Sequence, residues 1–328
     1  MSPAGTTRGR SHRDPTMTSP AIPIPVQRLR TYASFVRFEH TLFSLPLIVA
    51  GIYSAPGRPM PVMRWLLIIV AAVGARTAAL ALNRLIDRRL DALNPRTRMR
   101  ELPAGRMKPA EAAGVLLAGA TAYLGACALL GTWYLRVSWV PLFVFSVYPY
   151  LKRFTPLCHL GVGAALALAP LAGYAAAHPD LDYPWAAVKL ALFALAWVSG
   201  FDIIYSTLDE ESDRANGVHS LVVWLGRRRA LQVSGLLHVV AFWQLVSAAV
   251  DLWGGVPLVP AWAPWAMPAM VGLFASAGVL LYLEQRWAED VQLAFFKVNV
   301  FVGFVVLAIV LLARYVTRQA PGSSVSLF

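Results

Sequence analysis

The chain has 328 residues, of which 58% are hydrophobic and only 14% are charged, and its mean hydropathy is +0.57. Soluble domains usually carry roughly 25% charged residues, so this composition indicates a polytopic membrane protein. The 29 Lys and Arg residues outnumber the 17 Asp and Glu residues, which gives a net charge of +12. The excess forms no basic patch interleaved with aromatic residues. We therefore expect basic cytoplasmic loops and no nucleic-acid partner.

The two ends of the chain and its two cysteines argue against a secreted, disulfide-linked protein. Residues 1–27 are rich in Ser, Thr, Pro and Arg and lack the apolar core of a secretory signal peptide. We expect them to form a disordered cytoplasmic tail, followed by a membrane domain over 28–318 and a C-terminal tail over 319–328. Cys127 and Cys158 lie in or beside apolar runs and are expected to be small core residues.

Apolar runs recur along the chain, each near the length of about 20 residues that crosses a bilayer as a helix. They predict an all-α bundle of about nine transmembrane helices. The predicted spans are 38–55, 63–86, 111–131, 134–151, 157–177, 184–207, 230–250, 265–285 and 293–315.

A first acidic motif stands at the end of the second predicted span. Asn83, Asp87 and Asp91 are spaced four residues apart, so their side chains share one face of a helix. Like charges in a row repel one another unless a cation lies between them. Mg²⁺ prefers oxygen ligands and is usually held by one or two carboxylates together with substrate phosphates. The motif therefore predicts a magnesium site.

A second acidic motif follows the apolar run from Trp185 to Phe201. Asp209 and Asp213 are again four residues apart. Asp202 precedes Asp209 by seven residues, nearly two helical turns, so we expect all three on one face. Two acidic stripes at the ends of membrane helices are hard to explain by packing and imply a shared ligand. The alternative is that these acids form interfacial ion pairs with neighbouring arginines.

The distribution of basic residues predicts how the bundle is oriented. The loops expected on the outer side contain only Arg58, Arg64 and Arg136, whereas the other loops are rich in arginine. Cytoplasmic loops carry an excess of Lys and Arg, so we expect the N-terminus in the cytoplasm. Both acidic motifs then fall on the cytoplasmic side, where we expect a polar cavity.

The two motifs resemble those of the UbiA family of membrane prenyltransferases. NxxxDxxxD over 83–91 and DxxxD over 209–213 are similar to the family's two aspartate motifs, and the segment from Tyr148 to Lys152 resembles its YxxxK element. Flanking residues agree with this, including Leu102-Pro-Ala-Gly105 after the first motif. The resemblance covers roughly residues 28–315.

The resemblance implies an aromatic prenyltransferase with Mg²⁺ as cofactor. It assigns catalytic roles to Asp87, Asp91, Asp209, Asp213 and Tyr148, with Asp202 as second choice for the group that takes the proton lost from the acceptor. The metal would be held by Asn83, Asp87, Asp91, Asp202, Asp209 and Asp213, and the diphosphate by Arg96, Arg100 and Lys152. Arg76 lies about two turns before Asn83, inside its helix, and would bind the aromatic acceptor or anchor the aspartates.

Residues 37–46 and 201–211 are similar to the 4-hydroxybenzoate polyprenyltransferase branch of the family. That branch includes relatives resembling the futalosine-pathway enzyme, which prenylates 1,4-dihydroxy-6-naphthoate for menaquinone. The resemblance implies transfer of a polyprenyl group from a polyprenyl diphosphate to a small hydroxylated aromatic acid in the cell (plasma or inner) membrane, and both acceptors stay open. Ser212 and Asn216 depart from the family pattern, in which a bulky aromatic and a His or Arg are frequent.

A different class of protein also fits some of these features. A membrane transporter or lipid-binding protein can use intramembrane acids to couple protons or cations. Its acids should be spread along a path across the bilayer, whereas the two motifs here are predicted to lie on one side.

Overall fold

The computed structural model describes residues 24–36, 41–57, 60–287 and 294–321, and all regular structure in these ranges is helical. The all-α prediction is confirmed. The helices are α1 (Ile24–Val36), α2 (Thr41–Ile52), α3 (Val62–Leu93), α4 (Pro109–Leu130), α5 (Thr132–Val137), α6 (Trp139–Leu151), α7 (Cys158–Ala177), α8 (Trp185–Ser206), α9 (Glu210–Ala215), α10 (Leu221–Leu225), α11 (Arg227–Trp253), α12 (Ala266–Arg286) and α13 (Ala294–Arg318).

Within the described ranges, seven helices are long and apolar enough to cross a membrane, so the predicted count of nine is not confirmed. The other two predicted spans, 38–55 and 134–151, coincide with shorter helices. α2 has 12 residues and contains Pro46, which has no N–H to donate. The second span is divided at Ser138, whose hydroxyl donates to the carbonyl of Leu135 at 2.7 Å and so competes for a backbone acceptor of the last turn of α5.

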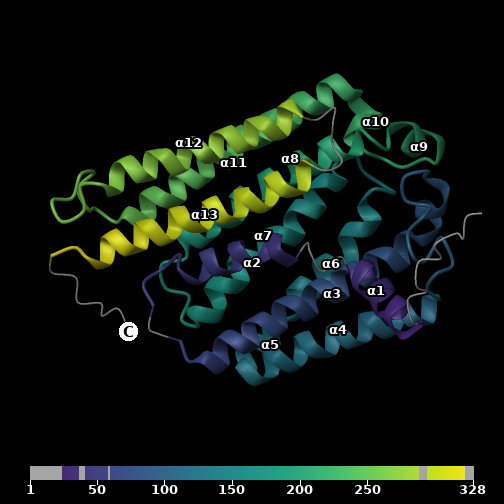
Figure 1. Cartoon of the computed structure of the whole chain (residues 1–328), viewed down its shortest axis with the longest axis horizontal. Helices are drawn as coiled ribbons and strands as arrows, with labels where there is room; N and C mark the ends of the chain where they lie inside the picture. Colours follow the sequence, from purple (N-terminus) through teal and green to yellow (C-terminus); the bar gives the residue numbers. More distant parts are fainter. Residues whose placement is uncertain (1–23, 37–40, 58–59, 288–293, 322–328) are drawn as a thin grey trace, which may run out of the picture.

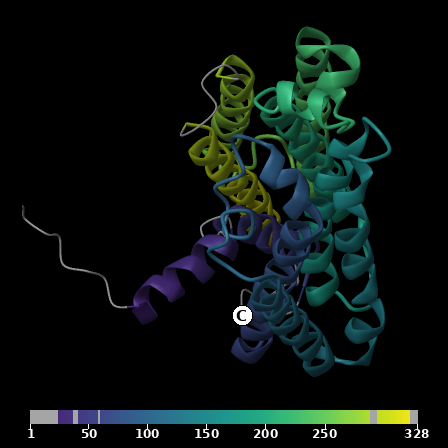
Figure 2. The same cartoon turned by 90° about the vertical axis from the view of Figure 1, so that its right-hand side faces the viewer.

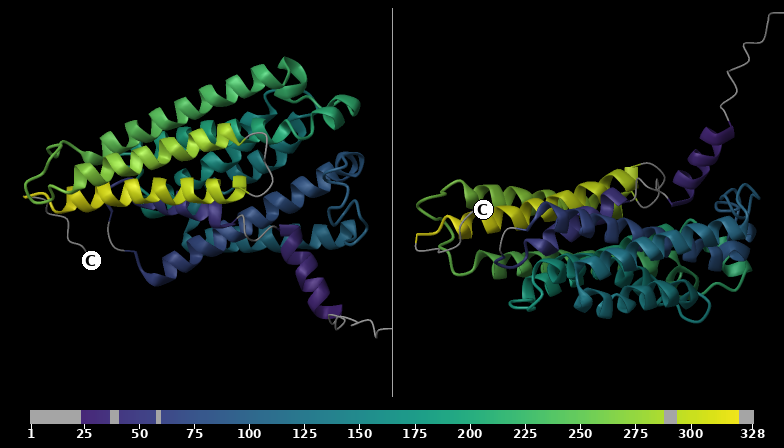
Figure 3. Two further views of the ribbon diagram at one scale, coloured as in Figure 1. Left: turned by 45° about the horizontal axis from the view of Figure 1, so that its top comes forward. Right: turned by 90° about the horizontal axis from the view of Figure 1, so that it is seen from below.

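The long helices run side by side along the longest axis of the molecule, with α8 among them (Figures 1 and 3). α8 is the most buried of the seven, because 67% of its apolar 18-residue stretch is buried inside the protein. Phe193 and Trp197 of α8 are fully buried, and their rings stack at a centroid distance of 5.4 Å. The main hydrophobic core therefore lies around α8, between α2, α11, α12 and α13.

Helices α2 and α7 approach each other closely at two glycines. A Cβ atom at Gly51 would lie 2.0 Å from the carbonyl oxygen of Pro170, and one at Gly173 would lie 2.0 Å from that of Ile48. Small residues of this kind let membrane helices pack backbone against backbone. The short helix α2 is thereby fixed in the bundle although it is shorter than a full span.

The two helices that carry the acidic motifs end in different ways. α3 continues to Leu93, two turns beyond the predicted end at 86, so Asp87 and Asp91 lie inside a regular helix. α8 ends at Ser206, where the hydroxyls of Ser206 and Thr207 donate to the carbonyls of Ile203 and Ile204, each at 2.7 Å. These bonds satisfy carbonyls at the end of the helix and offer the chain an alternative to another helical turn.

The prediction that Asp202, Asp209 and Asp213 share one face of a single helix is therefore wrong. Asp202 belongs to α8, whereas Asp209 lies beyond the end of α8 and is the residue that precedes α9. α9 and α10 lie at the same end of the bundle as the end of α3 (Figure 1).

Helix α1 diverges from the bundle (Figures 2 and 3). Ser34 links it to the segment after α3 by donating to Oε1 of Glu101 at 2.7 Å. Residues 24–27, expected to belong to the N-terminal tail, are the first turn of α1. Residues 1–23 and 322–328 and the branch-specific residues 37–40 lie outside the described ranges. Cys127 and Cys158 are buried and free of disulfides, in line with the expected core role.

Candidate active site

The first acidic stripe is buried and paired with cations from two other segments. Asp87 is 2% exposed, and its Oδ2 accepts hydrogen bonds from Nζ of Lys152 at 2.7 Å and from Nδ2 of Asn83 at 3.0 Å. Nη2 of Arg153 lies 3.6 Å from the other oxygen, Oδ1. The end of α6 thus supplies two positive charges to one carboxylate of α3.

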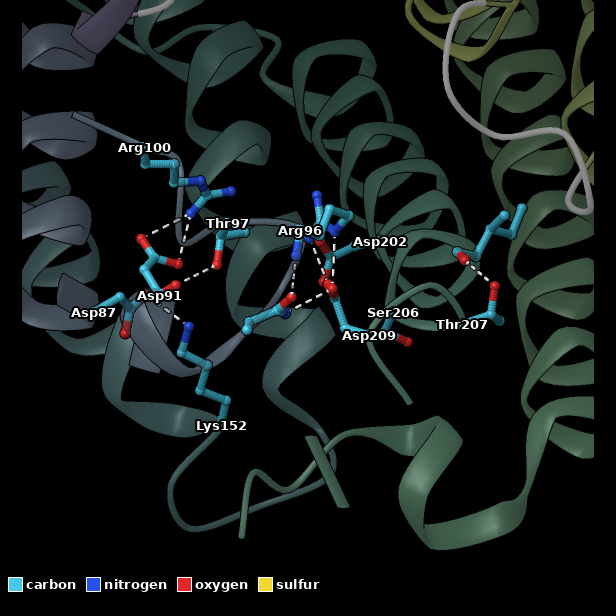
Figure 4. Close-up of polar contacts among 12 residues, drawn as sticks. Asp87, Asp91, Arg96, Thr97, Arg100, Lys152, Asp202, Ser206, Thr207 and Asp209 are labelled. Atoms are coloured by element: carbon cyan, nitrogen blue, oxygen red, sulfur yellow. Dashed lines mark hydrogen bonds and ion pairs between the residues drawn. The ribbon is translucent and has the colours of Figure 1, made fainter. Parts of the chain in front are cut away.

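Asp91, one turn further along α3, is 7% exposed. Nη1 of Arg100 donates to both of its carboxylate oxygens, at 2.8 and 3.0 Å. The hydroxyl of Thr97 donates to the backbone carbonyl of Asp91 at 3.0 Å and folds the following segment back onto the helix end. Figure 4 shows these contacts beside the Asp87–Lys152 pair.

The second stripe is joined to the segment after α3. Nε of Arg96 donates to Oδ1 of Asp209 at 2.8 Å, and Nη2 of Arg96 donates to Oδ2, so the contact has two bonds (Figure 4). Nδ2 of Asn94 also donates to Oδ1 of Asp209, at 2.7 Å. Burial lowers the pKa of Arg96, but the hydrogen bonds and charge of Asp209 outweigh this and leave the pKa above its ordinary value. The two acidic motifs therefore meet at one end of the bundle.

The remaining two aspartates of the second motif lie in different surroundings. Burial and the negative charge of Asp209 raise the pKa of Asp213 to about 6, and the hydrogen bond with Ser220 only partly offsets this. Asp202, on α8, has its Oδ2 at 2.7 Å from Nδ1 of His159 on α7.

Tyr148 and Arg76 lie near the two stripes. Tyr148 is partly buried on α6, one turn before Lys152. It lies close enough to Asp87, Asp202 and Arg76 to interact with their charges. The structure thus brings the predicted acceptor-binding arginine and the predicted catalytic tyrosine together with one aspartate from each stripe.

A metal ion fits this donor set, although the acids are not gathered in one cluster. In the described part of the chain, no three His, Cys, Asp or Glu side chains form a group that could hold a metal. Asp87, Asp91 and Asp209 are each paired with a basic residue. These contacts are of the kind expected from the alternative interpretation, in which the acids form interfacial ion pairs with basic residues. Mg²⁺, however, needs only one or two carboxylates when phosphates complete its shell. Oδ1 of Asp87 is a buried carboxylate oxygen that accepts no hydrogen bond from the described residues.

Comparison with known proteins identifies the family. The sequence model of the UbiA prenyltransferase family matches residues 44–304. The chain belongs to the UbiA prenyltransferase family. The predicted family and the predicted enzyme class are both confirmed.

Curated UbiA relatives and solved UbiA structures match most of the chain. A 4-hydroxybenzoate octaprenyltransferase from Vibrio campbellii is 28% identical over 67% of this chain and 78% of its own length. A UbiA homologue from Aeropyrum pernix has a TM-score of 0.72 and 31% identity, covering 83% of this chain and 97% of that one. A UbiA homologue from Archaeoglobus fulgidus bound to GPP and Mg²⁺ shares the fold, with a TM-score of 0.64 and 15% identity. The match covers 87% of this chain and 99% of that one.

One cavity lies beside the candidate site, along α3. It has a volume of about 600 Å³ and is lined by residues of α3, α6 and the segment after α9, including Arg153 and Asn216. None of the predicted site residues lines it. Arg153 separates it from the first stripe, because the same side chain reaches Asp87.

Reasoning from the sequence assigned no role to several residues that contact the predicted site residues, among them Asn94, Arg153 and His159. Asn94 directly follows the helix of the first motif, and Arg153 directly follows Lys152. Each lies at the end of a helix that carries a predicted site residue, so its polar side chain could have been expected to face the same site. His159 opens an apolar run, and only its position on the motif side of the bundle could have drawn attention to it.

Proposed function

We propose that this UbiA protein transfers a polyprenyl group from a polyprenyl diphosphate to a hydroxylated aromatic carboxylate of the 4-hydroxybenzoate type, with Mg²⁺, in quinone biosynthesis. The observation that carries the proposal is the contact of Arg96 with Asp209, which joins the segment after the first acidic stripe to the second stripe. Carboxylates for a metal and cations for a diphosphate are thereby gathered at one end of the bundle.

The oxygen donors for Mg²⁺ in this proposal are Asn83, Asp87, Asp91, Asp202, Asp209 and Asp213. When bound, the metal supplies charge neutralisation for the leaving diphosphate. Arg96, Arg100 and Lys152 already contact these carboxylates, so they lie within reach of a diphosphate held there. Arginine suits two-bond contacts with phosphate oxygens, and lysine acts as a point charge.

The chain's own residues then direct an electrophilic aromatic substitution. The allylic carbon–oxygen bond breaks, the diphosphate leaves with the electron pair, and a prenyl carbocation remains. The carbon next to the acceptor hydroxyl attacks this cation, and the ring loses a proton. In this proposal Tyr148 orients the acceptor or takes that proton, with Asp202 as second candidate, and Arg76 binds the acceptor carboxylate. The apolar helices exclude water, which would quench the cation.

The proposed site faces the cytoplasm. The end of the bundle that holds both stripes also holds the basic segments between the helices, among them Arg98, Arg106 and Arg227–Arg229. Arg64 lies near the start of α3 and Arg136 near the end of α5, both at the opposite end of the bundle (Figure 1). The positive-inside rule then supports a cytoplasmic site and N-terminus in a multi-pass protein of the cell membrane.

The acceptor is the finer part of the proposal. Curated relatives such as those from Vibrio campbellii and Vibrio cholerae are named 4-hydroxybenzoate octaprenyltransferase, which favours 4-hydroxybenzoate. 1,4-Dihydroxy-6-naphthoate is the alternative, because it is also a hydroxylated aromatic carboxylate. The structure of the Archaeoglobus fulgidus homologue with GPP and Mg²⁺ supports a prenyl diphosphate and a divalent metal as ligands.

The test is an assay of the purified full-length chain with geranyl diphosphate and MgCl₂, offering each of the two acids in turn. We expect Mg²⁺-dependent release of diphosphate together with one prenylated acid, identified by mass spectrometry. EDTA should abolish both signals. Release of no diphosphate with either acid, in protein that is folded by its thermal unfolding curve, would favour the transporter or lipid-binding alternative.

A further inference from the structure

One buried imidazole joins the second acidic stripe to the segment that follows it. His159, the second residue of α7, has a side chain that is 5% exposed. Its Nε2 accepts a hydrogen bond from the backbone N–H of Leu221 at 3.2 Å. The ring proton therefore lies on Nδ1, which donates to Oδ2 of Asp202 at 2.7 Å. Both ring nitrogens are in use, and each contacts a different element.

Asp202 is the more open partner of this pair, with a side chain that is 30% exposed. Its Oδ2 is directed to His159, so the carboxylate presents its other oxygen, Oδ1, away from the imidazole. At metal sites, hydrogen bonds between histidine and carboxylate side chains fix the orientation of the group that binds the metal. A bond of the same kind here joins the buried His159 to the more exposed Asp202. His159 therefore sets how Asp202 faces Tyr148, whose hydroxyl lies near enough to interact with it.

The other nitrogen of His159 belongs to a set of bonds that fix residues 219–221. The backbone N–H of His219 donates to the carbonyl of Lys152 at 2.7 Å, and Sγ of Cys158 donates to the carbonyl of His219 at 3.3 Å. Ser220, between these anchors, is 2% exposed and forms a hydrogen bond with Asp213. The bond from Leu221 to His159 closes this set.

We propose that His159 is a positioning residue of the prenyltransferase site. Its Nδ1–H holds Asp202 in the orientation that the reaction uses, and its Nε2 secures the chain at Leu221, close to Asp213 and Lys152. The inference rests on the proposed function for its kinetic part, whereas its structural part stands on the contacts alone.

Two conservative variants separate the two nitrogens. The amide of His159→Asn places an N–H donor near the position of Nδ1 and cannot reach Leu221, whereas His159→Gln places an acceptor near the position of Nε2 and cannot serve Asp202 in the same way. With geranyl diphosphate, MgCl₂ and 4-hydroxybenzoate, we expect His159→Ala to lower kcat about 10- to 100-fold, the usual range for such supporting residues. His159→Asn should recover most of this loss, and His159→Gln should not.

A double-mutant cycle with Asp202→Asn decides whether His159 acts through Asp202. If it does, His159→Ala adds little to the loss already caused by Asp202→Asn. The positioning role would be overturned if the double variant lost kcat by the product of the two single losses. It would also be overturned if His159→Ala kept full activity, or if His159→Gln restored kcat and His159→Asn did not. His178→Ala is the matched control, because His178 is also buried but contacts the carbonyl of Ile52 at the opposite end of the bundle, at 3.2 Å. Its kcat should equal that of the wild type.

Hydrogen exchange provides a readout that does not depend on activity. The amide of Leu221 should exchange faster in His159→Ala and His159→Asn than in the wild type, and at the wild-type rate in His159→Gln. Unchanged exchange in all three variants would refute the bond to Leu221. A wild-type protein that releases no diphosphate with either acid would instead refute the proposed function and leave this exchange test intact.

Discussion

The two acidic stripes reach the same site by different physical means. Asp87 and Asp91 are placed by one uninterrupted helix of 32 residues, so their spacing follows directly from the helical repeat. Asp209 lies in the turn after α8 and precedes α9, and its carboxylate makes no hydrogen bond to the backbone of α9. It faces Arg96 and Asn94 instead. Local geometry fixes the first stripe, and tertiary contacts fix the second.

This difference makes the second stripe depend on the first. Asn94 directly follows α3 and Arg96 lies two residues further on, so the segment after the first motif also holds the second motif in place. Glu101 anchors the same segment. Burial raises the pKa of its carboxyl, but hydrogen bonds from Ser34 and from a backbone N–H and the charges of Arg84 and Arg106 outweigh burial and lower the pKa below its ordinary value. A change in this segment should therefore disturb Asp209 before it disturbs Asp87.

The largest effect is expected for the aspartate that local structure holds most firmly. Asp87→Asn keeps the shape of the side chain but removes the charge that Lys152 and Arg153 face, along with a proposed metal ligand. Loss of electrostatic stabilisation at a leaving diphosphate should lower kcat by roughly 10³-fold. Diphosphate release from geranyl diphosphate measures it.

Asp251→Asn is the matched control for this change. Asp251 also forms an ion pair with a lysine, Lys189, at 2.7 Å, but it lies at the opposite end of the bundle. Its loss should leave kcat unchanged. If Asp87→Asn retains activity within tenfold of the wild type, the first stripe is a structural ion pair and not the centre of the site.

A smaller effect is expected from the contact that joins the stripes. Arg96→Lys keeps a positive charge but cannot make both bonds to Asp209 at once. Loss of one charged hydrogen bond is worth about 1.5–3 kcal/mol, so kcat/KM for geranyl diphosphate should fall roughly 10- to 100-fold.

Arg98→Lys serves as the control in the same segment, because Arg98 is exposed and contacts neither stripe in the described structure. Its kcat/KM should stay near the wild-type value. An unchanged kcat/KM in Arg96→Lys would show that the segment contributes only its overall charge. Equal losses in the two variants would show that the effect is not specific to Arg96, and either result would refute the dependence of the second stripe on Arg96.

The contrast between the stripes also explains which features could be predicted from the sequence. The spacing of Asn83, Asp87 and Asp91 predicted a shared helical face, and α3 confirms it because nothing interrupts the helix before Leu93. The same argument failed from Asp202 to Asp209, because Ser206 and Thr207 end α8 between them. Helical spacing predicts positions only while the helix continues.

The partners of the acids were harder to predict than the acids themselves. Arg96, Arg100 and Lys152 were assigned to the diphosphate, and the structure shows each of them on an aspartate. Their role toward a diphosphate stays a prediction. The contact between His159 and Asp202 spans 43 residues and depends on how α7 packs against α8, which no local pattern encodes.

The smallest effect concerns Asp213, an acid of the second stripe that is affected by burial and by the negative charge of Asp209. Its pKa of about 6 lies above the ordinary value of about 3.9, so the folded protein binds this proton more tightly than the unfolded chain does. Ionisation of Asp213 therefore destabilises the fold, increasingly as the pH rises from about 4 to about 6, and the full cost is present at pH 7.5.

In EDTA, Asp213→Asn should raise the apparent Tm by a few degrees at pH 7.5 and by little at pH 4.5. MgCl₂ should narrow the difference at pH 7.5 by stabilising the wild type, since a bound cation offsets the repulsion from Asp209. A variant that is less stable than the wild type in EDTA at pH 7.5 would show that Asp213 is stabilised by its neighbours, and the second stripe would then be as well compensated as the first.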